Sequence, residues 1–273
     1  MKAEKKYLST SKHYLSQRFW RFLRHIVPLY FWNFLYSLRQ KLLLNSLKQM
    51  LDKELQGIKL SKSSGEKHSA TYRDILLSTN EVFLKDALVL RELFSSFESD
   101  KAVLHNYNYL YSALFSEMKG TCKDILEIGT YKGASLRSWK AFFPSAQVYG
   151  IDIDPDTVFE EERIKTMIAD QNDLESMAAV NKLWNTEFDV VIDDGWHQPE
   201  ASVLSMISFI PKLKKKGIYV LEDIDQTKYS SFYNELVEIF IKHGYYAEYL
   251  DLPSLVPPTN SGYSYGVLVI VNT

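Results

Sequence analysis

The second half of the chain alternates short apolar runs with segments of helical periodicity. Strand-like runs lie at 124–129, 146–153, 164–169, 188–193 and 217–223, with helices expected near 133–143, 156–163, 173–183, 198–213 and 230–243. Strands separated by helices predict a parallel, doubly wound sheet. The last two runs, 246–252 and 265–272, are separated by prolines and no helix, which predicts an antiparallel hairpin at one edge. The expected fold is α/β, with a mostly parallel seven-stranded sheet and a C-terminal antiparallel hairpin.

The first 70 residues differ in character from the rest. Residues 1–50 carry ten lysines and arginines against the single acid Glu4, although the whole chain has a net charge of −2. Residues 13–56 predict helices broken near Pro28, and the polar stretch 59–70 predicts a linker. We therefore expect a basic, aromatic helical extension with its linker over 1–70 and a second domain over 71–273. That domain divides into lead-in helices (71–121, including a helix near 75–97) and a sheet core (122–273).

The N-terminal extension leaves two interpretations open. Aromatic side chains such as Trp20 and Trp32 are interleaved with arginines such as Arg21 and Arg24, which suits a helix lying in a membrane interface. The other interpretation is a helical subdomain that packs on the main domain or on a second subunit as a homo-oligomer. The stretch 26–38 is shorter than the roughly 20 apolar residues that span a bilayer. With Cys122 as the only cysteine, a cytoplasmic setting is expected, peripheral at the inner face of the membrane if the extension binds it.

The first strand ends in a glycine turn, "EIGTYKGAS" (127–135). Gly129 and Gly133 let the backbone turn sharply and approach a ligand closely. Tyr131 stands where the dinucleotide fingerprint has its second glycine, so a pyrophosphate lacks its cradle and NAD is disfavoured. An acid-x-Gly-x-x-x-Gly turn instead suits S-adenosylmethionine, which carries no phosphate. The alternative is a tight strand–helix turn without a ligand.

The next two strand ends offer further contacts to such a cofactor. Asp152 closes the second strand, where an acid accepts hydrogen bonds from both ribose hydroxyls; Asp154 lies past the strand end and is the weaker candidate. Asp170 or Gln171 after the third strand could hold the adenine edge. Ordinary helix capping is the alternative for these loop residues.

Four carboxylates follow the fourth and fifth strands: Asp193 and Asp194, then Glu222 and Asp223. Acids this close repel one another unless a cation joins them, and Mg²⁺ prefers such oxygen ligands. The lysines at 212 and 214–216 precede the fifth strand and should lie at its opposite end, so a metal is favoured. His197 follows the acids and suits a general base, since its ordinary pKa lies near 6.5; the alternative is an exposed residue at a helix start.

Together these segments resemble the class I S-adenosylmethionine methyltransferases, and within them the metal-dependent sugar O-methyltransferases of macrolide and related glycoside tailoring, a group that includes cephalosporin hydroxylase-like proteins. The resemblance covers about 98–273, including the lead-in "SDKAVLHNYNYLYSALF". It implies S-adenosylmethionine and Mg²⁺ as cofactors. It also assigns metal ligation to Asp194, Glu222 and Asp223, with Asp194 and His197 catalytic and His197 the general base. This chain departs from the family's pattern at Trp196, where the family has a small serine. The cofactor contacts expected are Glu127, Gly129, Tyr131, Gly133, Ser135, Asp152, Asp170, Gln171 and Asp193.

The sequence thus predicts a Mg²⁺-dependent O-methyltransferase that acts on a sugar hydroxyl of a glycoside or surface polysaccharide. Two alternatives remain: a methyltransferase of a catechol or lipid-linked acceptor, and a non-catalytic binding protein that keeps the fold. Nucleic acid is not expected as a partner, because the domain is acidic and its strand ends are rich in carboxylates. The expected partner is a small-molecule or glycan acceptor.

Overall fold

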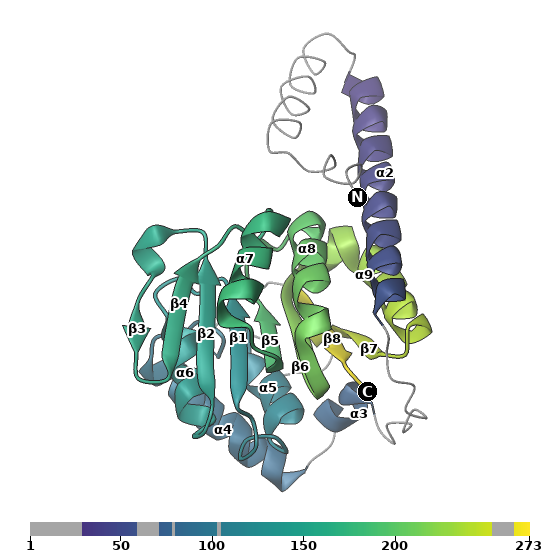
Figure 1. Ribbon diagram of the computed structural model, residues 1–273. Coiled ribbons are helices and arrows are strands. Elements are labelled where there is room, and N and C mark those ends of the chain that lie inside the picture. Colours follow the sequence, from purple (N-terminus) through teal and green to yellow (C-terminus); the bar gives the residue numbers. More distant parts are fainter. Residues whose placement is uncertain (1–28, 59–70, 78–79, 103–104, 253–264) are drawn as a thin grey trace. The chain divides into compact units, whose positions relative to one another are not determined.

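The computed structural model describes residues 29–58, 71–77, 80–102, 105–252 and 265–273. Within these residues, eight strands form one sheet in the order β3-β4-β2-β1-β5-β6-β8-β7 (Figure 1). The strands are β1 (Asp124–Ile128), β2 (Gln147–Asp152), β3 (Glu160–Glu161), β4 (Ile164–Ile168), β5 (Phe188–Asp193), β6 (Leu213–Asp225), β7 (Tyr246–Asp251) and β8 (Tyr265–Val271).

The strand order reverses at β1. From β1 the chain adds β2 and β4 on one side, then crosses to add β5 and β6 on the other, with all these neighbours parallel. β8 pairs antiparallel with both β6 and β7. The predicted doubly wound sheet and its C-terminal hairpin are therefore confirmed. In such a sheet the crevice for a ligand opens at the carboxyl ends of the strands beside the reversal, here β1, β2 and β5.

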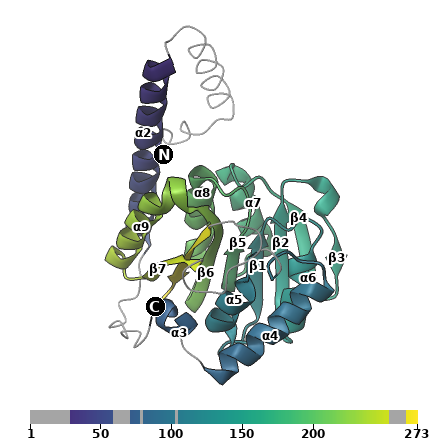
Figure 2. The ribbon, with the colours of Figure 1, turned by 180° about the vertical axis from the view of Figure 1, so that it is seen from behind.

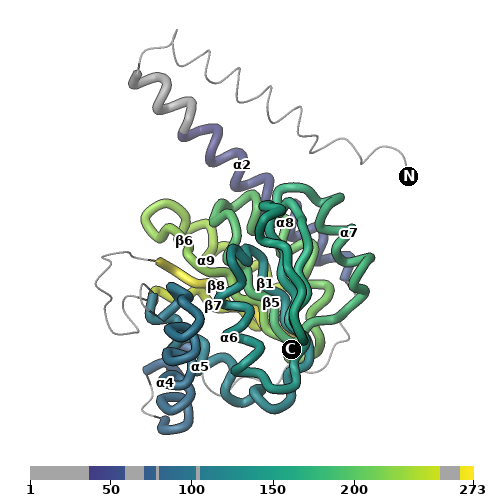
Figure 3. The backbone as a smooth tube through the Cα atoms, turned by 90° about the vertical axis from the view of Figure 1, so that its left-hand side faces the viewer, coloured from purple at the N-terminus to yellow at the C-terminus, as the bar shows by residue number. Residues whose placement is uncertain are grey.

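Helices cover both faces of the sheet. α4, α5 and α6 lie over one face, which Figure 2 turns toward the viewer, and α7 and α8 lie over the other (Figure 1). Figure 3 shows the two layers from the side. The bounds are α3 (Tyr72–Leu77), α4 (Glu81–Ser96), α5 (Tyr107–Phe115), α6 (Ala134–Phe142), α7 (Leu174–Trp184), α8 (Pro199–Phe209) and α9 (Gln226–Lys242), with short 3-10 turns η1 (Pro155–Thr157) and η2 (Ile210–Lys212).

Two stretches differ from the sequence prediction. The helix expected at 156–163 is wrong: only the turn η1 forms, and β3 then pairs antiparallel with β4, adding the eighth strand. β6 begins at Leu213 rather than near 217, although its first residues are lysines. The charge of Lys214 is compensated there, because its ammonium donates to Asp124 Oδ2 at 2.7 Å and to Asp189 Oδ2 at 2.9 Å. The predicted position of these lysines, at the opposite end of the sheet from the carboxylates, is thereby confirmed for Lys214.

Aromatic side chains fill the core between the sheet and the helices α4, α5 and α6. The ring of Trp139 lies 4.8 Å from that of Tyr111 and 5.1 Å from that of Phe94, in edge-to-face arrangements. All three side chains are fully buried. Such pairs stabilise by roughly 1 kcal/mol beyond the area that they bury. They fix α5 against the sheet and so set where its tyrosines meet the strand ends.

The N-terminal helix α2 runs over Leu29–Gly57. The chain divides into two compact units, Met1–Gln49 and Met50–Thr273, so the last turns of α2 fall in the unit that contains the sheet. There Asp52 accepts from His243 Nε2 at 2.6 Å and from Lys242 Nζ at 2.9 Å. No helix in the described part of the chain is long and apolar enough to cross a bilayer. Part of the predicted helical extension (13–28) and all of its linker (59–70) lie outside the described residues. The contact of the extension with a membrane or a second subunit stays a prediction.

Candidate active site

The glycine turn after β1 closes tightly against the end of β5. Gly129 has a φ of +86°, and a Cβ built on it would lie 2.2 Å from the backbone oxygen of Asp194. The Asp194 N–H donates to Ile128 O at 2.9 Å, which joins the same two segments. Only glycine fits this conformation and this approach. Gly133, the residue just before α6, also has a left-handed conformation, with a φ of +76°.

A pocket of about 540 Å³ opens at these strand ends, within the range of ligand sites for small molecules. Nine of the residues predicted from the sequence line it: Gly129, Tyr131, Ser135, Asp152, Asp170, Gln171, Asp194, His197 and Asp223. Glu127, Gly133, Asp193 and Glu222 are not among its lining residues. Lys101 and Trp196 also line the pocket, and Trp196 is 64% exposed.

Asp152 connects the end of β2 to the glycine turn. Its Oδ2 accepts from the N–H groups of Thr130 at 2.9 Å and Tyr131 at 2.8 Å. Its Oδ1 accepts from Asp154 N–H at 3.0 Å, and the carboxylate still borders the pocket. An acid held in this way at the end of the second strand matches the position of a ribose ligand in a doubly wound fold.

The residues after β4 make hydrogen bonds to other groups of the protein. Asp170 Oδ1 caps the following turn by accepting from Asn172 N–H at 2.8 Å. Gln171 donates to Asp193 Oδ1 at 2.6 Å, and its Oε1 accepts from Trp196 N–H at 2.8 Å. The sequence predicts a cofactor contact for Asp193, but this side chain is 1% exposed and its Oδ2 accepts from Tyr219. Its place is therefore behind the pocket, where it supports Gln171, and burial raises the pKa of Asp193 to about 6.

Three further side chains of the pocket lie close together: those of Asp194, His197 and Asp223. Each offers one ligand atom, and these atoms lie within 4.8 Å of one another. His197 Nε2 is 3.9 Å from Asp194 Oδ1. His197 and Asp223 have φ values of 51° and 54°, a left-handed conformation uncommon outside glycine. Two carboxylates converging on one point fit a divalent cation with oxygen ligands, and the imidazole lies beside them.

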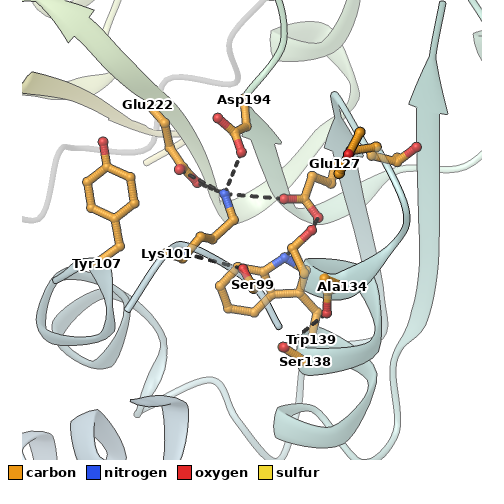
Figure 4. Close-up of polar contacts among 12 residues, drawn as sticks. Ser99, Lys101, Tyr107, Glu127, Ala134, Ser138, Trp139, Asp194 and Glu222 are labelled. Atoms are coloured by element: carbon orange, nitrogen blue, oxygen red, sulfur yellow. Dashed lines mark hydrogen bonds and ion pairs between the residues drawn. The ribbon is translucent and has the colours of Figure 1, made fainter. Parts of the chain in front are cut away.

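Behind this group lies a carboxylate cluster of Glu127, Asp194 and Glu222, joined by one ammonium (Figure 4). Lys101 Nζ is 2.7 Å from Asp194 Oδ2 and 2.7 and 2.8 Å from the two oxygens of Glu222. It is 3.4 Å from Glu127 Oε1. The sequence predicts Glu222 as a metal ligand, but the structure buries it at 1% exposure with both oxygens on Lys101.

Two tyrosines of α5 complete this arrangement. The hydroxyl of Tyr111 donates to Glu222 Oε1, and the hydroxyl of Tyr107 donates to Asp223 Oδ1. Burial raises the pKa of both phenols well above the usual value, so both remain donors. Each tyrosine thus fixes one of the adjacent acids at the end of β6.

Burial also shifts the pKa values of Glu127 and Lys101. It raises the pKa of Glu127 to about 7, although Lys101 opposes the shift. Glu127 Oε2 accepts from Ser135 Oγ at 2.7 Å and Trp139 Nε1 at 3.1 Å, so this residue braces α6 and does not reach the pocket. Burial lowers the pKa of Lys101, but the carboxylate cluster outweighs it and holds this pKa well above its ordinary range. The surrounding carboxylates therefore favour the charged form of Lys101.

Sequence reasoning assigned no role to Lys101, Tyr107 or Tyr111. All three fall in the lead-in "SDKAVLHNYNYLYSALF", whose pattern of lysine and spaced tyrosines was the available signal. Its residues lie before the first strand, and no local periodicity shows that their side chains reach the strand ends.

Comparisons with known proteins find similarity to methyltransferases. Residues 126–224 match the family Methyltransf_24, described as a methyltransferase domain. Over 143 residues the chain is 37% identical to mycinamicin VI 2''-O-methyltransferase of Micromonospora griseorubida. Over 141 residues it is 33% identical to 8-demethyl-8-alpha-L-rhamnosyl tetracenomycin-C 2'-O-methyltransferase of Streptomyces olivaceus. The first match covers 50% of this chain and 36% of the relative, and the second 49% and 37%.

A solved structure extends the comparison to the fold. The MycE methyltransferase of the mycinamycin biosynthetic pathway, in complex with Mg, SAH and mycinamycin VI, is similar with a TM-score of 0.51 and 28% identity. The similarity covers 66% of this chain and 52% of that one. With the sheet order described above, it confirms the class I methyltransferase fold.

Proposed function

We propose that this chain, whose residues 126–224 form a methyltransferase domain, is an S-adenosylmethionine- and Mg²⁺-dependent O-methyltransferase that acts on a sugar hydroxyl. The observation that carries the proposal is the meeting of Asp194, His197 and Asp223 in the pocket of the glycine turn. A cofactor contact, a cation site and a base are thereby brought within one cavity. A catechol or lipid-linked acceptor and a non-catalytic role are less well supported, because the relatives are named as O-methyltransferases and one of the names includes a rhamnosyl group.

The pocket fits the two groups that the family implies. Gly129, whose turn packs closely against the backbone of Asp194, lines the pocket, and Asp152 borders the same space. When bound, S-adenosylmethionine supplies an electrophilic methyl group on a sulfonium, and Mg²⁺ supplies positive charge that lowers the pKa of a hydroxyl. The residues proposed to hold Mg²⁺ are Asp194 and Asp223, with Glu222 behind them.

His197 is placed to act as the general base. Its side chain is 36% exposed, lines the pocket and has Nε2 directed toward Asp194. His197 Nδ1 is buried without a hydrogen-bond partner in the described residues, which leaves Nε2, on the side of Asp194, as the ring nitrogen proposed to meet the acceptor. We propose that the imidazole takes the proton of the acceptor hydroxyl as its oxygen bonds to the methyl carbon and the carbon–sulfur bond breaks. A positioned base contributes about 10²–10⁴ in rate.

The acceptor class rests on the relatives. One is named for 2''-O-methylation of mycinamicin VI and one for 2'-O-methylation of a rhamnosyl tetracenomycin-C, and the structural neighbour was solved with mycinamycin VI. The chain spans about a third of the length of those curated relatives. The exposed indole of Trp196 at the pocket's mouth would meet the acceptor beside His197. A sugar of a glycoside or surface polysaccharide is the proposed substrate.

The test measures S-adenosylhomocysteine formation with a panel of rhamnosides, with and without EDTA. We expect EDTA to abolish turnover and added Mg²⁺ to restore it. His197→Ala should lower the rate by about 10²–10⁴, and Asp194→Asn should lower it further by also weakening metal binding. His243→Ala is the matched control, because that histidine pairs with Asp52 and is not among the residues that line the pocket. Turnover indifferent to EDTA, with His197→Ala equal to His243→Ala, would reject the proposed mechanism.

A further inference from the structure

Lys101 is a buried cation at the centre of the site. Its side chain is 2% exposed, although it comes from the segment between α4 and α5 and from no element of the sheet. The three acids that it contacts belong to three neighbouring strands: Glu127 on β1, Asp194 at the end of β5, and Glu222 on β6. One ammonium therefore joins three adjacent strand ends (Figure 4).

Each acid of the carboxylate cluster depends on this contact. Glu222 directs both oxygens to Lys101. Glu127 Oε1 is buried and has no hydrogen-bond partner in the described part of the chain, so the ammonium 3.4 Å away is the positive charge that it faces. Without Lys101, these buried carboxylates would lose their common counter-charge, a loss that is strongly destabilising in a protein interior.

Asp194 links this buried cluster to the pocket. Its Oδ2 accepts from Lys101 at 2.7 Å, while its Oδ1 lies on the side of His197, 3.9 Å from Nε2. Anchoring one oxygen fixes the rotation of the carboxylate and so directs the other oxygen toward His197 and Asp223.

We infer that Lys101 is a positioning residue for the divalent cation: it holds Asp194 and Glu222 in place, so that Asp194 Oδ1 faces the pocket with Asp223 and His197. The inference rests on the proposed function for the identity of the cation. It makes Lys101 a fixed part of the site, which stays bound to the carboxylate cluster when the metal arrives.

The sign of the effect on metal binding separates this role from a simple charge effect. By Coulomb's law alone, removing a positive charge beside the site would tighten the binding of a dication. Removing a group that orients the ligands has the opposite effect and typically costs 10–100-fold in metal affinity. A lysine that competes with the metal and one that positions its ligands therefore predict opposite results.

The experiment titrates MgCl₂ and MnCl₂ into the full chain by calorimetry, with wild type, Lys101→Met and Lys214→Met compared. We expect Lys101→Met to weaken metal binding roughly 10–100-fold. Lys214→Met is the matched control, because Lys214 also bridges two carboxylates, at the opposite end of the sheet; it should leave metal affinity unchanged. Binding of S-adenosylhomocysteine, measured separately, should persist in both variants and shows that the pocket is intact.

Unchanged or tighter metal binding in Lys101→Met would overturn the inference. If that variant does not fold, Lys101→Gln, which keeps a hydrogen-bond donor, replaces it in the same titration. Should both variants stay unfolded until MgCl₂ alone refolds them, the metal would suffice to assemble the acids and the inference would also fail. Because no acceptor is present, a failure of methyl transfer alone would count against the proposed function and leave this result standing.

Discussion

Gly129→Ala should damage both the stability of the protein and its cofactor pocket. The added Cβ would lie 2.2 Å from the backbone oxygen of Asp194 and 2.7 Å from its carbonyl carbon. These are main-chain atoms, so no side-chain rotation can relieve the overlap. The turn after β1 and the end of β5 would have to separate, and the hydrogen bond from Asp194 N–H to Ile128 O joins these segments.

The magnitude follows from two contributions. An alanine at a φ of +86° carries the left-handed penalty of about 1–2 kcal/mol. Losing the Asp194–Ile128 hydrogen bond costs about 0.5–1.5 kcal/mol more. We therefore expect a loss of about 1.5–3.5 kcal/mol in the free energy of unfolding. For a domain of this size that lowers the melting temperature by roughly 10 °C.

Thermal denaturation followed by circular dichroism measures the stability, and calorimetry with S-adenosylhomocysteine measures the pocket. Gly120→Ala is the matched control, because a Cβ there meets nothing within 4 Å and its φ is not left-handed. The free energy of unfolding of that variant should lie within about 0.5 kcal/mol of the wild-type value. If Gly129→Ala melts and binds like Gly120→Ala, then the close approach of the two segments is not a constraint and the reasoning fails.

Two further predictions concern groups on either side of the first strand. Asp152→Ala should weaken S-adenosylhomocysteine binding by about 1–3 kcal/mol, measured by calorimetry, because a charge-assisted acceptor is lost; equal affinity would remove Asp152 from the cofactor site. Burial raises the pKa of the Cys122 thiol to about 12, so the folded protein should resist iodoacetamide at pH 9 while the unfolded chain reacts. The folded state keeps its proton above pH 9, so this thiol's contribution to stability should decline as the pH rises from about 9 toward 12; rapid alkylation of folded protein would contradict its burial.

The sequence was most informative where a function depends on local backbone conformation or on strand ends. Gly129 could be placed in a tight turn because only glycine serves there, and Asp194 and Asp223 could be placed at one edge because parallel strands bring their carboxyl ends together. These inferences need only the neighbouring residues and the direction of the strands. The structure places each of the three residues at the pocket.

Long-range contacts were beyond such reasoning. To offset the repulsion among the acids, the sequence favoured a metal over the lysines at 212 and 214–216, whereas the structure brings in Lys101, from a loop before the first strand. Similarly, the sequence pattern predicted a helix at 156–163, but Glu160 and Glu161 pair with β4 instead. Both results depend on which segments meet in three dimensions, and one sequence does not state that.

The two halves of the site differ in what holds them. Glu222 is fixed from behind by Lys101 and Tyr111 in a fully buried environment. Toward the pocket, His197 and Asp223 keep left-handed backbone conformations, which cost on the order of 1 kcal/mol each and persist only where surrounding structure imposes them. Of the two carboxylates beside His197, Asp194 accepts from Lys101 and Asp223 accepts from Tyr107, so both side chains are held in place. Ligands held in this way are already in place before a cation or acceptor arrives, so little binding energy need be spent on ordering them.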